Sequence, residues 1–123
     1  MEGNLAHIVG GQIVWLSRWT TGANPESLEQ LESIRGFDAI RQSFAESHAG
    51  LREYLASLGE EDLDRVLDYT DSRGNRNQRV MWQLLLHLAN HGTHHRAETA
   101  MAMVAMGKPM RELDYHFFEM ERA

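Results

Sequence analysis

The chain has 123 residues and a formal net charge of −6, so we expect one domain over residues 1–123 with a modest core. It contains no cysteine, which excludes disulfides, thiolate metal sites and a cysteine nucleophile within these residues. The acidic balance argues against nucleic-acid binding, and without an apolar run of ~18 residues or a basic signal-peptide start we expect a cytoplasmic protein that spans no membrane.

The first expected helix runs from about Asn4 to Trp19 and carries two stripes at helical spacing. One stripe is apolar and comprises Leu5, Val9, Ile13 and Leu16, and the other is mixed and comprises His7, Gly11, Val14, Trp15 and Arg18. A helix with two such faces is typically packed between neighbours. Gly10 and Gly11 each cost roughly 1 kcal/mol relative to alanine in a helix, so the pair either weakens this helix or permits another one to approach closely.

The middle of the chain predicts a connector, a second helix and a hairpin. Residues 20–36 are expected to form a connector with one short helical turn. A second long helix is expected from about Phe37 to Leu58, with His48 on its apolar stripe. Turn-forming residues at 71–75 follow a short β-prone run, which favours a hairpin or irregular connection over residues 66–80.

The last long helix is expected from about Arg79 to Met106, with Gly107 just beyond its end and Pro109 following. A short terminal helix is expected within residues 111–122. Together these elements predict an all-α fold in which three long helices pack as a bundle.

Histidine is the unusual residue type: seven are present, and four of them fall within nine residues of the last long helix. His87, His91 and His95 climb one stripe, with His94 and Glu98 close to the same line. Buried imidazoles need partners for both nitrogens, and a divalent ion supplies one because neutral imidazole binds zinc, nickel, copper or iron.

Two ligands on one helix require a third from elsewhere in the chain. His7 and His48 are candidates by position, and His116 is a candidate by residue type alone. His91 and His95 have the histidine spacing of the zincin motif His-Glu-x-x-His, but Gly92 stands where that motif places its general base. The sequence therefore disfavours a zinc peptidase.

Three stretches carry a resemblance to a known family. Residues 84–98, Leu-Leu-Leu-His-Leu-Ala-Asn-His-Gly-Thr-His-His-Arg-Ala-Glu, resemble the signature helix of the DinB/YfiT-like family of metal-dependent proteins. Met-Gly-Lys-Pro at 106–109 with Asp114 resembles the usual ending of that family, and residues 5–12 with 15–18 resemble the helix that carries its third metal ligand. The resemblance spans most of the chain.

This resemblance implies a four-helix bundle, often a homodimer, in which His7, His91 and His95 hold a divalent metal ion. Characterised relatives include thiol-dependent S-transferases and a maleylpyruvate isomerase that uses a low-molecular-weight thiol. We therefore expect a metal-dependent transferase acting on a small molecule with a thiol, with metal-assisted hydrolysis as a variant. Zinc or nickel is the expected metal, with manganese or iron as further candidates, and no organic cofactor site is predicted. The candidate pocket residues are Trp15, Arg18, His48, His87 and Glu98.

The chain departs from the family pattern in two places. Ala97-Glu98 replaces the usual Gly-Gln, so Glu98 is expected to be a hydrogen-bond partner of a ligand histidine or a base. The usual first helix of the family has no counterpart ahead of His7, which predicts either a longer gene product or a second subunit over the exposed groove. A dimer is expected in both cases.

Two other interpretations stay open. In the first, the protein is a non-catalytic, stress-related bundle with a structural metal, a role that a fourth ligand from His48 or Glu98 would favour. In the second, no metal is bound and the histidines form a pH-responsive cluster.

Overall fold

The computed structural model describes residues 2–28, 31, 33–111 and 113–122. The helices are α1 (Glu2–Thr21), α3 (Phe37–Ser57), α4 (Met81–Ala105) and α5 (Tyr115–Arg122), and a short 3-10 helix, η1 (Glu60–Asp64), precedes the strands. The strands β1 (Val66–Thr70) and β2 (Arg76–Val80) form an antiparallel hairpin between α3 and α4. The predicted helical fold and the predicted hairpin connection are thus confirmed. Part of the expected connector, at residues 29, 30 and 32, lies outside the described residues.

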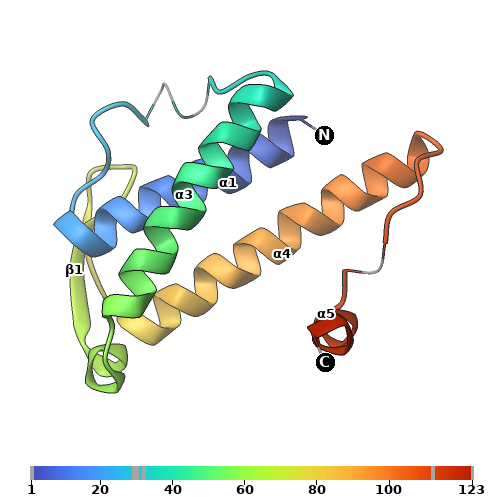
Figure 1. Cartoon of the computed structure of the whole chain (residues 1–123). Coiled ribbons are helices and arrows are strands. Elements are labelled where there is room, and N and C mark those ends of the chain that lie inside the picture. Colours follow the sequence, from blue (N-terminus) through green and yellow to red (C-terminus); the bar gives the residue numbers. More distant parts are fainter. Residues whose placement is uncertain (1, 29–30, 32, 112, 123) are drawn as a thin grey trace.

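The three long helices pack around α1. It contacts α3 on one side and α4 on the other, and α4 runs on past both of them toward its C-terminal end (Figure 1). Between α1 and α3, Ile8, Val9 and Ile40 are almost fully buried, and the Ser47 hydroxyl donates to the Gln12 side-chain oxygen at 2.9 Å. Figure 1 shows α5 apart from these three helices, so a fourth helix packed beside them, as in a four-helix bundle, is not confirmed.

The hairpin closes one end of the helix cluster and completes its core. Tyr69 of β1 is buried with Trp19 of α1 and with Met81 and Leu84 of α4. The turn is built on Asp71, whose carboxylate accepts the backbone N–H groups of residues 73 and 75 and the Asn77 side-chain amide at 2.9–3.0 Å. Side chains of the polar return strand β2 remain mostly exposed, which is why the strand signal in the sequence is weak.

The helix α4 ends as the sequence predicted, with Gly107 just beyond its last turn. Gly107 has a φ of 73°, and the N–H groups of Gly107 and Lys108 donate to the carbonyls of Val104 and Met103, both at 2.9 Å. This is a Schellman motif, in which a residue without Cβ satisfies the last carbonyls of a helix. Within the described residues, no helix is long and apolar enough to cross a membrane.

Candidate metal centre

Three histidines from two helices meet where α1 crosses α4. One ring nitrogen from each of His7, His91 and His95 lies within 4.8 Å of the others. The Nε2 atoms of His7 and His91 are 3.1 Å apart, and the ring of His7 lies 4.5 Å from that of His95, centroid to centroid. The structure thus brings together the three residues that the family resemblance implied as metal ligands, and a single small cation could contact all three rings.

A glycine in α1 makes this meeting possible. α1 is continuous through Gly10 and Gly11, so the pair does not break the helix. A Cβ built on Gly11 would lie 3.0 Å from Cε1 and 3.3 Å from Nδ1 of the His91 ring, closer than ordinary van der Waals contact. Among the residues that the structure describes, a Cβ on Gly10 would meet only the Leu31 Cβ, at 4.0 Å. Of the two alternatives that the glycine pair left open, close approach of a second helix is therefore correct, and Gly11 is the residue that permits it.

Glu98 stands directly behind the site, one turn further along α4. One carboxylate oxygen lies 3.1 Å from Nδ1 of His95, and the other lies 2.9 Å from Nε2 of His94. The hydrogen bond from His95 holds the pKa of Glu98 below its usual range, so the carboxylate is ionised at neutral pH. With Nδ1–H donating a hydrogen bond to the Glu98 carboxylate, the lone pair of the neutral His95 ring is on Nε2, which is the arrangement that metal-binding histidines use.

The protonation state of His91 also suits a metal ligand. Burial, together with the neighbouring His7 and His95, lowers its pKa from 6.5 to about 4. The imidazole is therefore neutral at physiological pH. A neutral ring can offer a nitrogen lone pair to a cation, whereas a protonated ring cannot.

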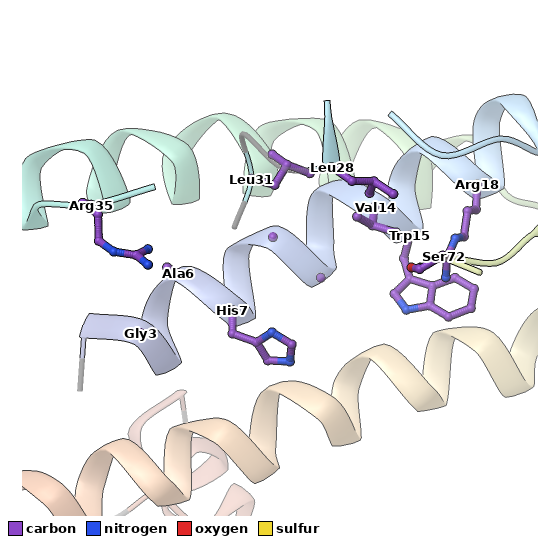
Figure 2. Close-up of a pocket in the computed structure, with 12 residues that line it drawn as sticks. Gly3, Ala6, His7, Val14, Trp15, Arg18, Leu28, Leu31, Arg35 and Ser72 are labelled. Carbon is purple, nitrogen blue, oxygen red and sulfur yellow. The ribbon is translucent and has the colours of Figure 1, made fainter. Parts of the chain in front are cut away.

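A cavity of about 490 Å³ lies along α1 and reaches the site at His7 (Figure 2). Its floor is the mixed stripe of α1 that the sequence analysis singled out: His7, Gly11, Val14, Trp15 and Arg18 all line it. Leu28, Leu31 and Arg35 from the connector and Ser72 from the hairpin turn complete the lining. In Figure 2 the His7 ring projects from α1 toward α4, at the opposite end of the stripe from Arg18. A second, smaller cavity of about 280 Å³ includes His91 and Arg96 in its lining.

Only some of the other predicted pocket residues line the cavity. Trp15 and Arg18 line the larger cavity, and the exposed His87 packs its ring 5.3 Å from that of Trp15, centroid to centroid. His48 is exposed on α3, where its ring contacts Phe44, because the buried residue of that turn is Ser47. The structure therefore does not bring His48 to the cavity along α1. His116 lies on α5, where its ring contacts Phe117.

Sequence reasoning missed the residues that the connector and the hairpin turn contribute to this cavity. Leu28, Leu31 and Arg35 come from the connector, and Ser72 comes from the hairpin turn. Leu28 and Leu31 are three residues apart and helical, as the short turn expected in the connector implies, but that spacing does not say where the turn packs. For Arg35 and Ser72 the signal in the sequence is proximity to turn-forming residues, which predicts a loop and not the place to which that loop folds back.

The model of the DinB family matches residues 1–122. The chain therefore belongs to the DinB family, as the three stretches of resemblance predicted. No curated protein and no solved structure matches the chain.

Proposed function

We propose that this member of the DinB family holds one divalent metal ion with His7, His91 and His95 and uses it in a thiol-dependent transfer reaction on a small molecule. The observation that carries the proposal is the convergence of three imidazole nitrogens, within 4.8 Å of one another, beside a 490 Å³ cavity that His7 lines. Metal sites with three protein ligands keep a position free for water or substrate, which is typical of catalytic centres.

The residues present fit a divalent ion of intermediate softness. All three donors are imidazoles, which suit zinc or nickel best and also accept manganese or iron. His91 is neutral at physiological pH because its pKa is lowered to about 4. The Glu98 carboxylate accepts a hydrogen bond from Nδ1–H of His95, which fixes the tautomer of that ring. A carboxylate behind a ligand histidine is the usual support for such a site.

A divalent ion held by these histidines supplies a Lewis acid that lowers the pKa of a thiol or a water molecule reaching it. Because the 123 residues include no cysteine, the sulfur nucleophile comes from a separate small thiol. The floor of the cavity, with Val14 and Trp15 on α1, and its wall of Leu28 and Leu31 bind the apolar part of the substrate and exclude water from it. Glu98 keeps the Nδ1 proton on His95, so the ring stays oriented toward the site.

A structural metal is the second candidate, because the three histidines join α1 to α4 directly. In that case the ion ties two helices together and no reaction is expected. The two roles predict different behaviour on metal removal. A catalytic site loses transfer activity while the helices stay folded, whereas a structural site loses helicity by circular dichroism.

The first experiment measures metal content and melting temperature of protein purified without a nickel column. Wild type is compared with His7→Ala and His91→Ala, and His48→Ala is the matched control because His48 is exposed on α3. We expect close to one metal ion per chain in wild type and control and none in the two ligand variants. A ligand present at ~1,000 times its dissociation constant stabilises the fold by about 4 kcal/mol, which raises the melting temperature by about 10 °C.

Activity is then tested with a chromogenic aryl halide and a panel of low-molecular-weight thiols. Conjugation that requires both the metal and His7 supports the transferase. The proposal is refuted if no sample holds metal after reconstitution with zinc, nickel or manganese. Metal-loaded protein that conjugates nothing and unfolds when chelated supports the structural role instead.

We also propose that two copies of the chain associate through the C-terminal half of α4 and α5. The large apolar side chains of this region are strongly exposed: Met101, Val104, Met106, Tyr115, Phe118 and Met120 range from 51% to 74%. Monomeric proteins rarely expose large contiguous apolar patches, so we expect these side chains to be covered by a second copy.

Light scattering coupled to size-exclusion chromatography tests the dimer. Wild type is expected at twice the mass of the chain. Val104→Asp is expected to shift it toward the monomer, while the control Glu53→Lys on α3 leaves it unchanged. A wild-type monomer at all concentrations would rule the dimer out.

A further inference from the structure

Arg18 is a buried cation at the end of the cavity farthest from His7. It is 5% exposed, and it lies in the last turn of α1. Its Nε donates to the Asn24 side-chain oxygen at 2.8 Å, and its Nη2 donates to the Ser72 hydroxyl at 2.9 Å. The guanidinium carbon lies 4.6 Å from the centroid of the Trp15 ring and 5.6 Å from that of Tyr69. The group is therefore fixed in one orientation by two hydrogen bonds and two aromatic rings.

Every one of these direct partners is neutral. Within the described part of the chain, Arg18 forms no ion pair with a carboxylate. Asp71 is the acid whose charge reaches it, but the Asp71 carboxylate is occupied by two backbone N–H groups and an amide of the hairpin turn. Burying a guanidinium without a paired anion is costly, and buried charges in proteins are normally paired.

The burial of Arg18 also affects its pKa. Burial lowers the pKa of Arg18 from its usual value, and the electrostatic effects of the neighbouring Tyr69 and Asp71 offset this only in part. An arginine stays protonated in proteins despite such a shift. The buried positive charge therefore persists, and no described hydrogen bond occupies its Nη1.

Between this cation and His7 the cavity is lined by small and apolar residues. Eight residues separate Trp15, beside the guanidinium, from His7, which is roughly 12 Å along the helix axis at 1.5 Å per residue. Val14, Gly10 and Gly11 of α1 line the path, and Leu28 and Leu31 face it from the connector. A ligand that spans the cavity is thus expected to be apolar in its middle and anionic at the Arg18 end.

We propose that Arg18 binds the carboxylate of an otherwise apolar small molecule whose other end reaches the histidine cluster. A planar guanidinium matches a carboxylate in geometry and charge. A phosphate would be less well satisfied, because the other polar groups at this end, Asn24 and Ser72, are neutral. The position of the reactive end rests on the proposed function, whereas the carboxylate subsite stands on Arg18 alone.

The test compares octanoate with its neutral analogue octanamide as probes for wild-type protein. Binding is followed by tryptophan fluorescence, since Trp15 contacts the guanidinium, and by thermal shift. A charge-assisted hydrogen bond to a buried group corresponds to about a tenfold preference or more, so octanoate is expected to bind about tenfold tighter than octanamide. Equal affinity of the two probes for wild type would overturn the subsite.

Two variants locate the effect. Arg18→Met is expected to abolish the preference for octanoate, and Arg18→Lys is expected to keep a preference but weaken octanoate binding because the planar fork is lost. A preference retained in full by Arg18→Met would overturn the assignment. If Arg18→Met does not fold, the wild-type comparison and Arg18→Lys still test the subsite. An Arg18→Lys variant that binds octanoate as tightly as wild type would contradict recognition of the carboxylate by the planar guanidinium.

A third variant separates this inference from the metal. His91→Ala is expected to lose the metal ion and to keep the preference for octanoate over octanamide. If His91→Ala loses the metal and still binds octanoate more tightly than octanamide, the subsite at Arg18 is supported independently of the metal. If wild-type protein holds metal but binds the two probes equally, the subsite is refuted and the proposed metal centre is not.

Discussion

An added methyl group at Gly11 tests the contact on which the histidine cluster depends. The Cβ of Gly11→Ala would lie 3.0 Å from Cε1 of His91, whereas carbon atoms in comfortable contact are about 3.5 Å apart or more. The His91 ring must therefore move by roughly half an ångström, or α1 and α4 must separate by as much. Displacements of about this size are enough to disable a metal or catalytic site.

Gly10→Ala is the matched control. Both substitutions remove a glycine from the middle of α1, which favours the helix by roughly 0.8–1 kcal/mol. At residue 10 the new methyl group meets, within the described part of the chain, only the Leu31 Cβ at 4.0 Å, so the full gain is expected. For a chain of this length that gain raises the melting temperature of the metal-free protein by roughly 4 °C.

The two variants are then compared for zinc affinity by competition with a chelating dye. Gly10→Ala is expected to bind zinc as wild type does. Gly11→Ala is expected to bind it roughly ten- to hundredfold more weakly, the range seen when the support of a ligand histidine is lost, and to gain less in melting temperature than Gly10→Ala. If Gly11→Ala matches Gly10→Ala in both measurements, the close approach of His91 does not control the site and the reasoning fails.

Three further predictions follow from the site and the end of α4. Glu98→Gln replaces the carboxylate that accepts the proton of His95, so zinc affinity measured by dye competition should fall about tenfold; unchanged affinity would contradict the positioning role. In metal-free protein the pKa of His91 is about 4 when the chain is folded and 6.5, the ordinary value for histidine, when it is unfolded, so the unfolded chain takes up the proton first and stability is lost as pH falls from 6.5 toward 4. After allowance for the solvent screening of a partly exposed ring, the loss is about 1–2 kcal/mol by urea denaturation, and a His91→Gln variant with the same pH slope would refute it. Gly107→Ala forces a side chain onto a φ of 73° and should cost about 1–2 kcal/mol in stability with zinc affinity unchanged, whereas a neutral effect would contradict the helix-end geometry.

The parts of the fold that depend on helical spacing were predictable. The three long helices occur where the periodic residues placed them, with ends shifted by a few residues, and Gly107 ends α4 as its residue type indicated. Periodicity reports the direction of a side chain only within its own helix. His48 shows the consequence: it shares a predicted stripe with Phe44, yet the structure buries Ser47 and leaves His48 exposed, one residue round the helix.

Long-range placement was less predictable. Spacing put His91 and His95 on one face, but which third histidine joins them depends on how α1 crosses α4, and spacing alone left His7 and His48 open. The family resemblance, and not the spacing, indicated His7 as the third ligand. The contact that decides the crossing involves Gly11, and a glycine carries no spacing signal for the ring that lies against it.

The mixed stripe of α1 shows why a helix with two faces is useful for function. Its first face packs against α3, with Val9 almost fully buried. Its second face was free to hold groups that a core would exclude: His7 near one end, Arg18 near the other, and small or apolar residues between them. Because one rigid helix carries both polar groups, the distance between the proposed metal centre and the proposed carboxylate subsite is set by the helical rise and not by a flexible loop. A substrate that contacts both ends would therefore be selected by its length as well as by its charge, and the octanoate and octanamide comparison can be extended to shorter and longer chains to measure that selection directly.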